Sequence, residues 1–170
     1  REILQEWAVR HTQNTQKGFF NNSNVLIFSG MNHYRTARVL TEFSDNLRFA
    51  DPVLQLGVPK FLSSFDALEL FAKGSHQILR WSPPHVLSPS VAPIKEWNHY
   101  IMRKAMHKAD VVVAFYEELE RHGLEELAGK TVITSSVSVS RLQALRDKGV
   151  NMVLDYSPQP FADQTISIEV

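Results

Sequence analysis

Cysteine is absent from this sequence of 170 residues. Its absence excludes disulfides, thiolate catalysis and zinc sites built from cysteine. An excess of charge of either sign is also absent, because lysine plus arginine number 18 and aspartate plus glutamate number 18. A chain with no net charge has no overall field that attracts nucleic acid or an anionic membrane. We therefore expect a partner that is neither nucleic acid nor membrane.

Long apolar runs are missing as well. No stretch approaches the roughly 18 apolar residues of a membrane-spanning helix. The opening stretch, REILQEWAVRHTQ, is charged from its first residue and lacks the apolar core of a signal peptide. Together with the lack of cysteine, this leads us to expect a cytoplasmic protein. Because the sequence begins without Met and stops at TISIEV, we expect a fragment of a longer protein and assign no catalytic residue within it.

What the sequence does contain is a series of short apolar runs separated by helical patterns. Continuous apolarity over so few residues is typical of strands buried on both faces of a parallel sheet. Strands alternating with helices predict an α/β, three-layer, Rossmann-like doubly wound sheet of about five mainly parallel strands. Residues 1–23 are predicted to form a helix and a linker, and residues 24–170 the Rossmann-like domain. The predicted strands are 24–28, 47–50, 110–116, 130–134 and 150–154.

Two helical segments and one loop carry more specific predictions. Residues 2–17 are predicted to form a helix whose apolar stripe contains Ile3, Leu4 and Trp7, with Val9 as a further candidate. A second helix begins after Ser63-Ser64 and ends near Gly74. Residues 80–93 hold four prolines and three serines, and we predict a long irregular loop there. That loop, with Trp81, is a candidate contact for a homodimer.

Glycine is scarce, with seven residues, and one of them closes the first predicted strand in the stretch IFSGMNHYR. Open α/β proteins bind nucleotide phosphates at such a junction through the pattern G-x-G-x-x-G. Gly30 matches the first glycine, whereas Asn32 and Arg35 stand at the second and third. Asparagine tolerates left-handed backbone, but arginine cannot allow the close contact of helix and strand that glycine permits. A dinucleotide, another anion or polar ligand, and a simple turn are therefore all open.

Several side chains near this junction suit a ligand. A helix N-terminus offers free N–H groups to a phosphate, Ser29 and Asn32 add polar contacts, and Arg35 adds charge. His33 is a candidate donor to a phosphate or a substrate. Asp51 follows Gly30 by 21 residues, where an acidic residue would hold a ribose hydroxyl. The alternative is that Asn32 caps the helix, the arginine is solvated and Asp51-Pro52 is a turn.

A second polar stretch, TSSVSVS, follows the predicted strand 130–134. Helix capping accounts for one or two of its five hydroxyls: Ser138 or Ser140 is predicted to cap the helix around residues 141–148, and Gly149 suits its C-terminal end. Thr134 and Ser135 are candidates to line a polar ligand pocket. Turn and cap chemistry alone is the alternative.

Histidines at positions 33, 85, 99 and 107 invite a comparison with metal sites. None belongs to a His-Glu-x-x-His pattern or has a carboxylate partner at ligand spacing. We predict no metal site.

Four segments, NVLIFSGMNHYRTARVLTEF, LRFADPVLQLGVP, ADVVVAFYEELERH and LAGKTVITSSVSVSRLQALRDKGVNMVLDYSP, carry a family resemblance. Over roughly residues 24–160 the chain resembles the C-terminal part of bacterial proteins labelled quinate (shikimate-type) 5-dehydrogenase. The resemblance implies NAD(P)-dependent oxidation of a ring hydroxyl, and a Rossmann-like ligand site at Gly30, Asn32, His33, Arg35 and Asp51. The catalytic Lys and Asp of shikimate dehydrogenases belong to a separate preceding domain and have no match here.

Two hypotheses follow, and they leave open whether the chain is part of an enzyme. The first is the nucleotide-binding domain of an NAD(P)-dependent quinate/shikimate-type dehydrogenase, with NAD or NADP as cofactor. The second is a non-catalytic Rossmann-like module that binds a small molecule or regulates. An open crevice bounded by Ser29, Asp51 and Ser135 would favour the first. A crevice filled by the side chain of His33 or Tyr34 would favour the second.

Overall fold

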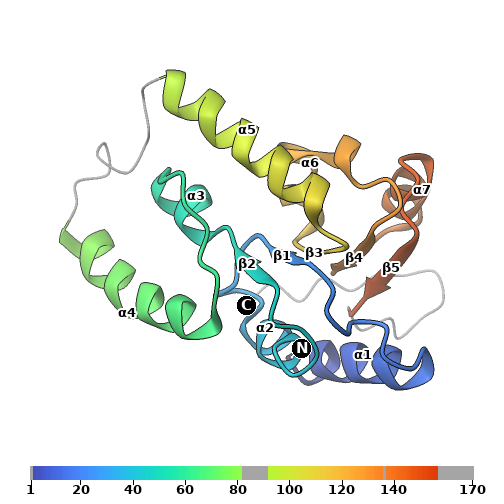
Figure 1. Cartoon of the computed structure of the whole chain (residues 1–170). Helices are drawn as coiled ribbons and strands as arrows, with labels where there is room; N and C mark the ends of the chain where they lie inside the picture. The colour runs from blue at the N-terminus through green and yellow to red at the C-terminus, as the bar shows by residue number, and fades with distance from the viewer. Residues whose placement is uncertain (1, 82–91, 136, 157–170) are drawn as a thin grey trace.

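The computed structural model describes residues 2–81, 92–135 and 137–156. Helices and strands alternate along most of this chain, as Figure 1 shows. In order the elements are α1 (Glu2–Thr15), β1 (Val25–Ile27), α2 (Tyr34–Leu40), β2 (Leu47–Phe49), α3 (Asp51–Leu56), α4 (Phe65–Trp81), α5 (Ala92–Lys108), β3 (Val111–Val113), α6 (Tyr116–His122), the 3-10 turn η1 (Leu124–Glu126), β4 (Thr131–Thr134), α7 (Val139–Asp147) and β5 (Met152–Asp155).

The five strands form one sheet in the order β2-β1-β3-β4-β5, and every neighbouring pair is parallel. This confirms the predicted Rossmann-like α/β class. The strand order reverses between β1 and β3, which is the point where open parallel sheets bind their ligands, beyond the carboxyl ends of the strands. Residues that follow β1 and β3 therefore define the place to look for a site.

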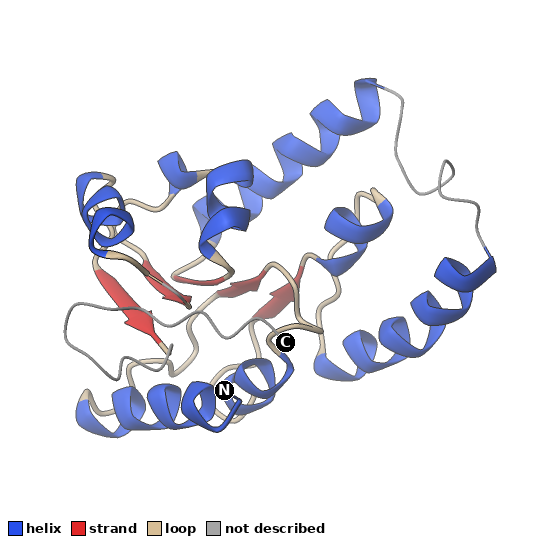
Figure 2. Ribbon diagram, turned by 180° about the vertical axis from the view of Figure 1, so that it is seen from behind, coloured by secondary structure: helices blue, strands red, loops and turns tan. Residues whose placement is uncertain are grey.

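Helices cover both faces of the sheet and bury one apolar cluster against each (Figure 2). Successive side chains of a strand point to opposite faces, so Leu26 joins one cluster while Val25 and Ile27 join the other. The first cluster includes residues of α3, α5, α6 and α7, and the second includes residues of α1, α2 and α4. The result is the predicted three-layer arrangement.

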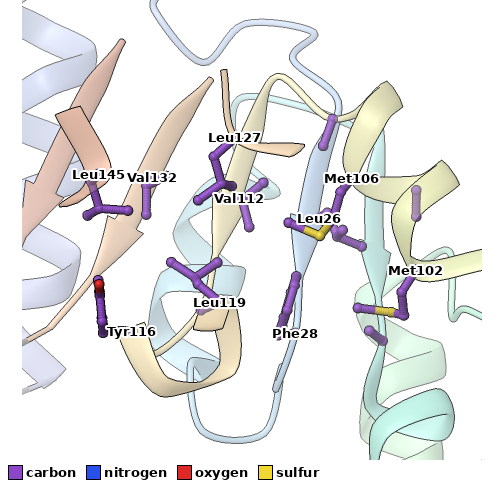
Figure 3. Close-up of a cluster of buried hydrophobic side chains, with 14 of the residues drawn as sticks. Leu26, Phe28, Met102, Met106, Val112, Tyr116, Leu119, Leu127, Val132 and Leu145 are labelled. Atoms are coloured by element: carbon purple, nitrogen blue, oxygen red, sulfur yellow. The ribbon is translucent and has the colours of Figure 1, made fainter. Parts of the chain in front are cut away.

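The first cluster is packed around two methionines of α5. Met102 and Met106 lie against the sheet residues Leu26 and Phe28, and Leu119 of α6 closes the cluster beside them (Figure 3). All five side chains are at least 98% buried. Burying a side chain of this size contributes about 1.5–3 kcal/mol, so this cluster fixes α5 and α6 on the sheet.

Helix α1 packs through a different face from the one its apolar residues predict. Ile3 and Trp7 of the predicted stripe are 74% and 60% exposed, and Leu4 is also exposed; Val9, the further candidate, is fully buried. The buried side of α1 is largely polar: the Thr36 hydroxyl of α2 donates to Gln5 Oε1 at 3.0 Å. The predicted apolar stripe was wrong at Ile3, Leu4 and Trp7 and right at Val9, because hydrogen-bonded polar side chains occupy most of the buried side of α1.

Two helix boundaries also differ from the prediction. Asp51-Pro52 begins helix α3 rather than forming only a turn, since proline is well suited to the first helical turn. Gly74 lies inside α4, which continues to Trp81; a Cβ at Gly74 would have no heavy atom within 4 Å. Of the predicted loop 80–93, its first two and last two residues are helical, and residues 82–91 lie outside the described residues.

The capping predictions made from sequence fared better. Ser64 Oγ accepts from the Ala67 N–H at the start of α4, and Ser138 Oγ accepts from the Arg141 N–H at the start of α7. Gly149 ends α7 with a φ of 74°, the left-handed conformation that glycine adopts freely. Hydroxyl and glycine signals were thus sufficient to place these helix ends.

Candidate functional site

Buried polar side chains gather at the carboxyl edge of the sheet. Each lies in the last residue of a strand or in the segment that follows it, and each is at least 93% buried: Ser29, His33, Asp51, Thr134 and Ser135. Polar groups are rarely buried unless they have partners or a role. Five of the eight sequence-predicted binding positions are in this set, and Gly30, also buried, lies among them.

Asp51 binds the turn that follows β1. Its carboxylate accepts the Gly30 N–H at 2.8 Å and the Met31 N–H at 3.2 Å. Gln55, one turn along α3, adds its side-chain amide at 3.3 Å. Successive backbone N–H groups at such a turn are the donors that a phosphate uses in dinucleotide-binding proteins. Here the chain's own carboxylate accepts them.

Burial sets the protonation behaviour of Asp51. Removal from water raises the pKa of its carboxyl above the ordinary value, and the negative charge of Glu118 acts in the same direction. The backbone hydrogen bonds from Gly30 and Met31 oppose the shift but do not cancel it. Asp51 is thus a buried carboxyl whose charge is stabilised mainly by two backbone donors.

Gly30 is required by packing rather than by an unusual backbone conformation. It is not among the glycines with positive φ. A Cβ at this position would lie 2.6 Å from Phe49 Cδ1 and 2.9 Å from both Leu68 methyl carbons. Side chains from β2 and α4 therefore occupy the space above the turn.

A second carboxylate binds the same turn from the other side. The Ser29 hydroxyl donates to Glu118 Oε1 at 2.5 Å. The other oxygen of Glu118 accepts the Phe115 N–H at 2.9 Å and so caps the start of α6. The end of β1 is consequently held by an acid that follows β2 and an acid that follows β3, its two neighbours in the sheet.

His33 fills the region between the ends of β1, β3 and β5. Its ring is fully buried and lies 4.5 Å, centroid to centroid, from the ring of Phe115. Its Nδ1 is 3.1 Å from the hydroxyl of Tyr156, which follows β5. Tyr34, by contrast, is partly exposed. Of the two side chains proposed to fill the crevice, His33 is the one placed there.

Thr134 and Ser135 stand at the end of β4, and both are buried. Within the part of the chain that the structure describes, Thr134 Oγ1 has no hydrogen-bond partner. A buried hydroxyl without a hydrogen-bond partner is uncommon, because such groups usually bind another protein group, a water or a ligand. Thr134 therefore marks a point in this edge where a polar group would be accepted.

Asn32 and Arg35 are not part of the buried cluster. Both are exposed, and no side-chain cap is formed at the start of α2. Arg35 lines a separate polar hollow of about 490 Å³ over α1 and α2, together with Arg38 and Arg10. Arg10 is held there by Glu42, which accepts two hydrogen bonds at 2.8 Å.

Three participants were missed from sequence: Glu118, Tyr156 and Gln55. Glu118 could have been found from the sequence, because an acid three residues after an N-cap position is the second half of a capping box. Tyr156 comes directly after the last strand, where ligand-edge residues are expected. No sequence pattern indicated Gln55, since its contact with Asp51 depends on Asp51 beginning a helix.

No group of three or more His, Asp or Glu side chains within residues 2–81, 92–135 and 137–156 is arranged to hold a metal ion. Over the same described ranges, no helix is both long and apolar enough to cross a membrane. His85 lies outside them.

Comparison with protein families places the chain. A family model described as a domain of unknown function, DUF8754, matches residues 1–170, and the chain belongs to that family. No curated protein matches, and no solved structure matches.

Proposed function

We propose that this DUF8754 member is a non-catalytic Rossmann-like domain that either binds a small molecule or serves as a regulatory module. The observation that carries the proposal is the Asp51 carboxylate on the Gly30 and Met31 N–H groups. A pyrophosphate at this turn would need the same donors. The residues present do not fit a dinucleotide in this arrangement.

Displacing Asp51 would be unfavourable. Hydrogen bonds to a charged group contribute about 1.5–3 kcal/mol each, and two of them would be lost. The released carboxylate would also remain close to the incoming phosphate and repel it. His33, packed between Phe115 and Tyr156, further fills the region near the switch point.

The ligand we propose is small and polar and approaches the ends of β3 and β4. The unpartnered hydroxyl of Thr134 supports this position. We further propose a cytoplasmic location, with neither nucleic acid nor membrane as partner, on the grounds of the zero net charge and the lack of cysteine. A homodimer formed through the segment 80–93 is part of the same proposal.

The second candidate is the nucleotide-binding domain of a quinate/shikimate-type dehydrogenase that uses NAD or NADP. It is favoured by the gathering of Ser29, Gly30, Asp51, Thr134 and Ser135 at one edge of the sheet. In that case Asp51 would have to leave the turn and accept hydrogen bonds from a ribose.

Calorimetric titration of the chain with NAD and with NADP separates the two. We expect no saturable heat from either, with the fold verified by circular dichroism in the same sample. Saturable binding of either dinucleotide would overturn the proposal. If that binding were lost in Asp51→Asn and kept in Asp45→Asn, an exposed acid with the same change of charge, the second candidate would be supported.

A further inference from the structure

A hollow of about 280 Å³ lies between α3, α5 and α6, on the face of the sheet covered by the first apolar cluster. This volume is just below the range of about 300–1,000 Å³ that is typical of ligand pockets, so the ligand must be small. None of the buried polar residues of the carboxyl edge lines it. The lining residues are Val53, Leu54, Lys95, Asn98, His99, Met102, Arg121 and His122.

Basic side chains reach this hollow from two helices, and no carboxylate lines it. Lys95 and His99 come from α5, Arg121 and His122 come from α6, and α3 supplies only apolar residues. Two acids adjoin the lining residues in sequence, Glu96 beside Lys95 and Glu120 beside Arg121, but neither lines this hollow. Glu96 lines a neighbouring hollow that His99 also borders. The groups are close enough to interact, since burial first, and then His99 and Arg121, lower the pKa of His122. Convergent basic groups, with no carboxylate in the lining, favour an anion.

Asn98 lines the hollow with a side-chain amide that is held in place. Its side-chain N–H donates to the Gly57 carbonyl at 2.8 Å, where Gly57 ends α3 with left-handed backbone. The amide is thereby oriented, and its Oδ1 is buried with no hydrogen-bond partner among the described residues. An anion alone cannot satisfy an acceptor; a group with an O–H can.

The remaining lining is apolar, from Val53, Leu54 and Met102. Such a surface suits the carbon body of a small molecule better than a fully hydrated ion.

We propose that the hollow between α3, α5 and α6 binds a small oxyanion that also carries an O–H group, such as a hydroxycarboxylate or a phosphate monoester. The basic groups bind the oxyanion, Asn98 Oδ1 accepts the O–H, and the apolar residues contact the body. This site is separate from the carboxyl edge and does not depend on the function proposed above.

Two probes distinguish the sources of the anion. The full chain is titrated calorimetrically with citrate, a hydroxycarboxylate, and with glycerol phosphate, a hydroxylated phosphate monoester. At least one is expected to bind, with a tenfold or greater loss of affinity in Arg121→Gln. Arg146→Gln, which removes the same charge from the last turn of α7, is expected to bind as the wild type does. Binding of citrate alone identifies a carboxylate ligand, and binding of glycerol phosphate alone identifies a phosphate ester.

A second readout comes from the imidazoles. Binding is expected to raise the pKa of His122 in an NMR titration, because the anion offsets the charges of His99 and Arg121, which lower that pKa. Asn98→Leu is expected to weaken either probe without abolishing the response of His122. Absence of binding by both probes, or equal loss in Arg121→Gln and Arg146→Gln, would overturn the proposal. Neither outcome bears on dinucleotide binding, which has its own titration.

Discussion

At the scale of single residues, two positions that suggest a cofactor loop in the sequence have structural explanations. Position 30 requires glycine because Phe49 and Leu68 pack where a larger residue would place its side chain. Asp51 lies 21 positions later and holds the Gly30 N–H. The spacing that indicates a ribose-binding acid also brings an acid to the end of β1, because β1 and β2 are parallel neighbours joined by one helix.

Gly30→Ala tests the packing argument. A Cβ 2.6 Å from Phe49 Cδ1 forces buried side chains to move, and overpacking of this kind costs about 1–3 kcal/mol. We expect the free energy of unfolding in urea to fall by that amount. Gly74→Ala is the matched control, because it adds a methyl group to a helix where no atom lies within 4 Å. There we expect a gain of about 0.5–1 kcal/mol. Equal effects of the two substitutions would contradict the argument.

At the scale of elements, the first turn of α6 carries two adjacent acids, Glu117 and Glu118, that contact different parts of the fold. Glu118 accepts the Ser29 hydroxyl and the Phe115 N–H. Glu117 is more exposed and forms an ion pair with Arg141 at 2.7 Å. Glu118 thus couples a helix start to the end of a neighbouring strand, whereas Glu117 links two helices at the surface.

Truncating each acid to alanine separates these roles. Glu118→Ala leaves a partly buried hydroxyl and a backbone N–H without their acceptor, which costs about 1–3 kcal/mol. Glu117→Ala removes an exposed ion pair worth about 0–1 kcal/mol. Chemical denaturation of both variants measures the difference, and equal losses in the two variants would contradict it.

At the scale of the whole molecule, the sequence predicted the fold well and the site only in part. Strand positions and their parallel pairing followed from short apolar runs that alternate with helical patterns. β1 and β3 are buried throughout, whereas Arg48 in β2 is exposed. Side-chain directions were harder to predict: His33 points inward and Asn32 outward, although both lie on the same loop. The packing face of α1 was predicted wrongly, because Gln5 is buried through a hydrogen bond that depends on Thr36 of another helix.

The pH dependence of stability tests the buried state of Asp51. Its folded pKa is raised above the ordinary 3.8, so the folded chain holds this proton more tightly than the unfolded chain does. The free energy of unfolding of the wild type, relative to Asp51→Asn, should therefore fall as pH rises from about 4 towards the folded pKa. Urea denaturation of both proteins at several pH values measures it. A relative stability that rises over this window would mean that the hydrogen bonds from Gly30 and Met31 outweigh desolvation.

The pairing of β1 with both β2 and β3 has a consequence for the order in which the chain folds. Val25 pairs with Leu47 on one side and with Val111 on the other, so the second contact closes a loop roughly four times longer. Loop-closure entropy grows by about 0.6 kcal/mol for each doubling, which makes the junction of β1 and β3 the more costly contact to form. Ser29 and Asp51 lie before that junction in the chain, and Glu118 and Thr134 lie after it. The carboxyl-edge cluster is thus assembled only when the two halves of the sheet join, and a partly folded chain has no complete site.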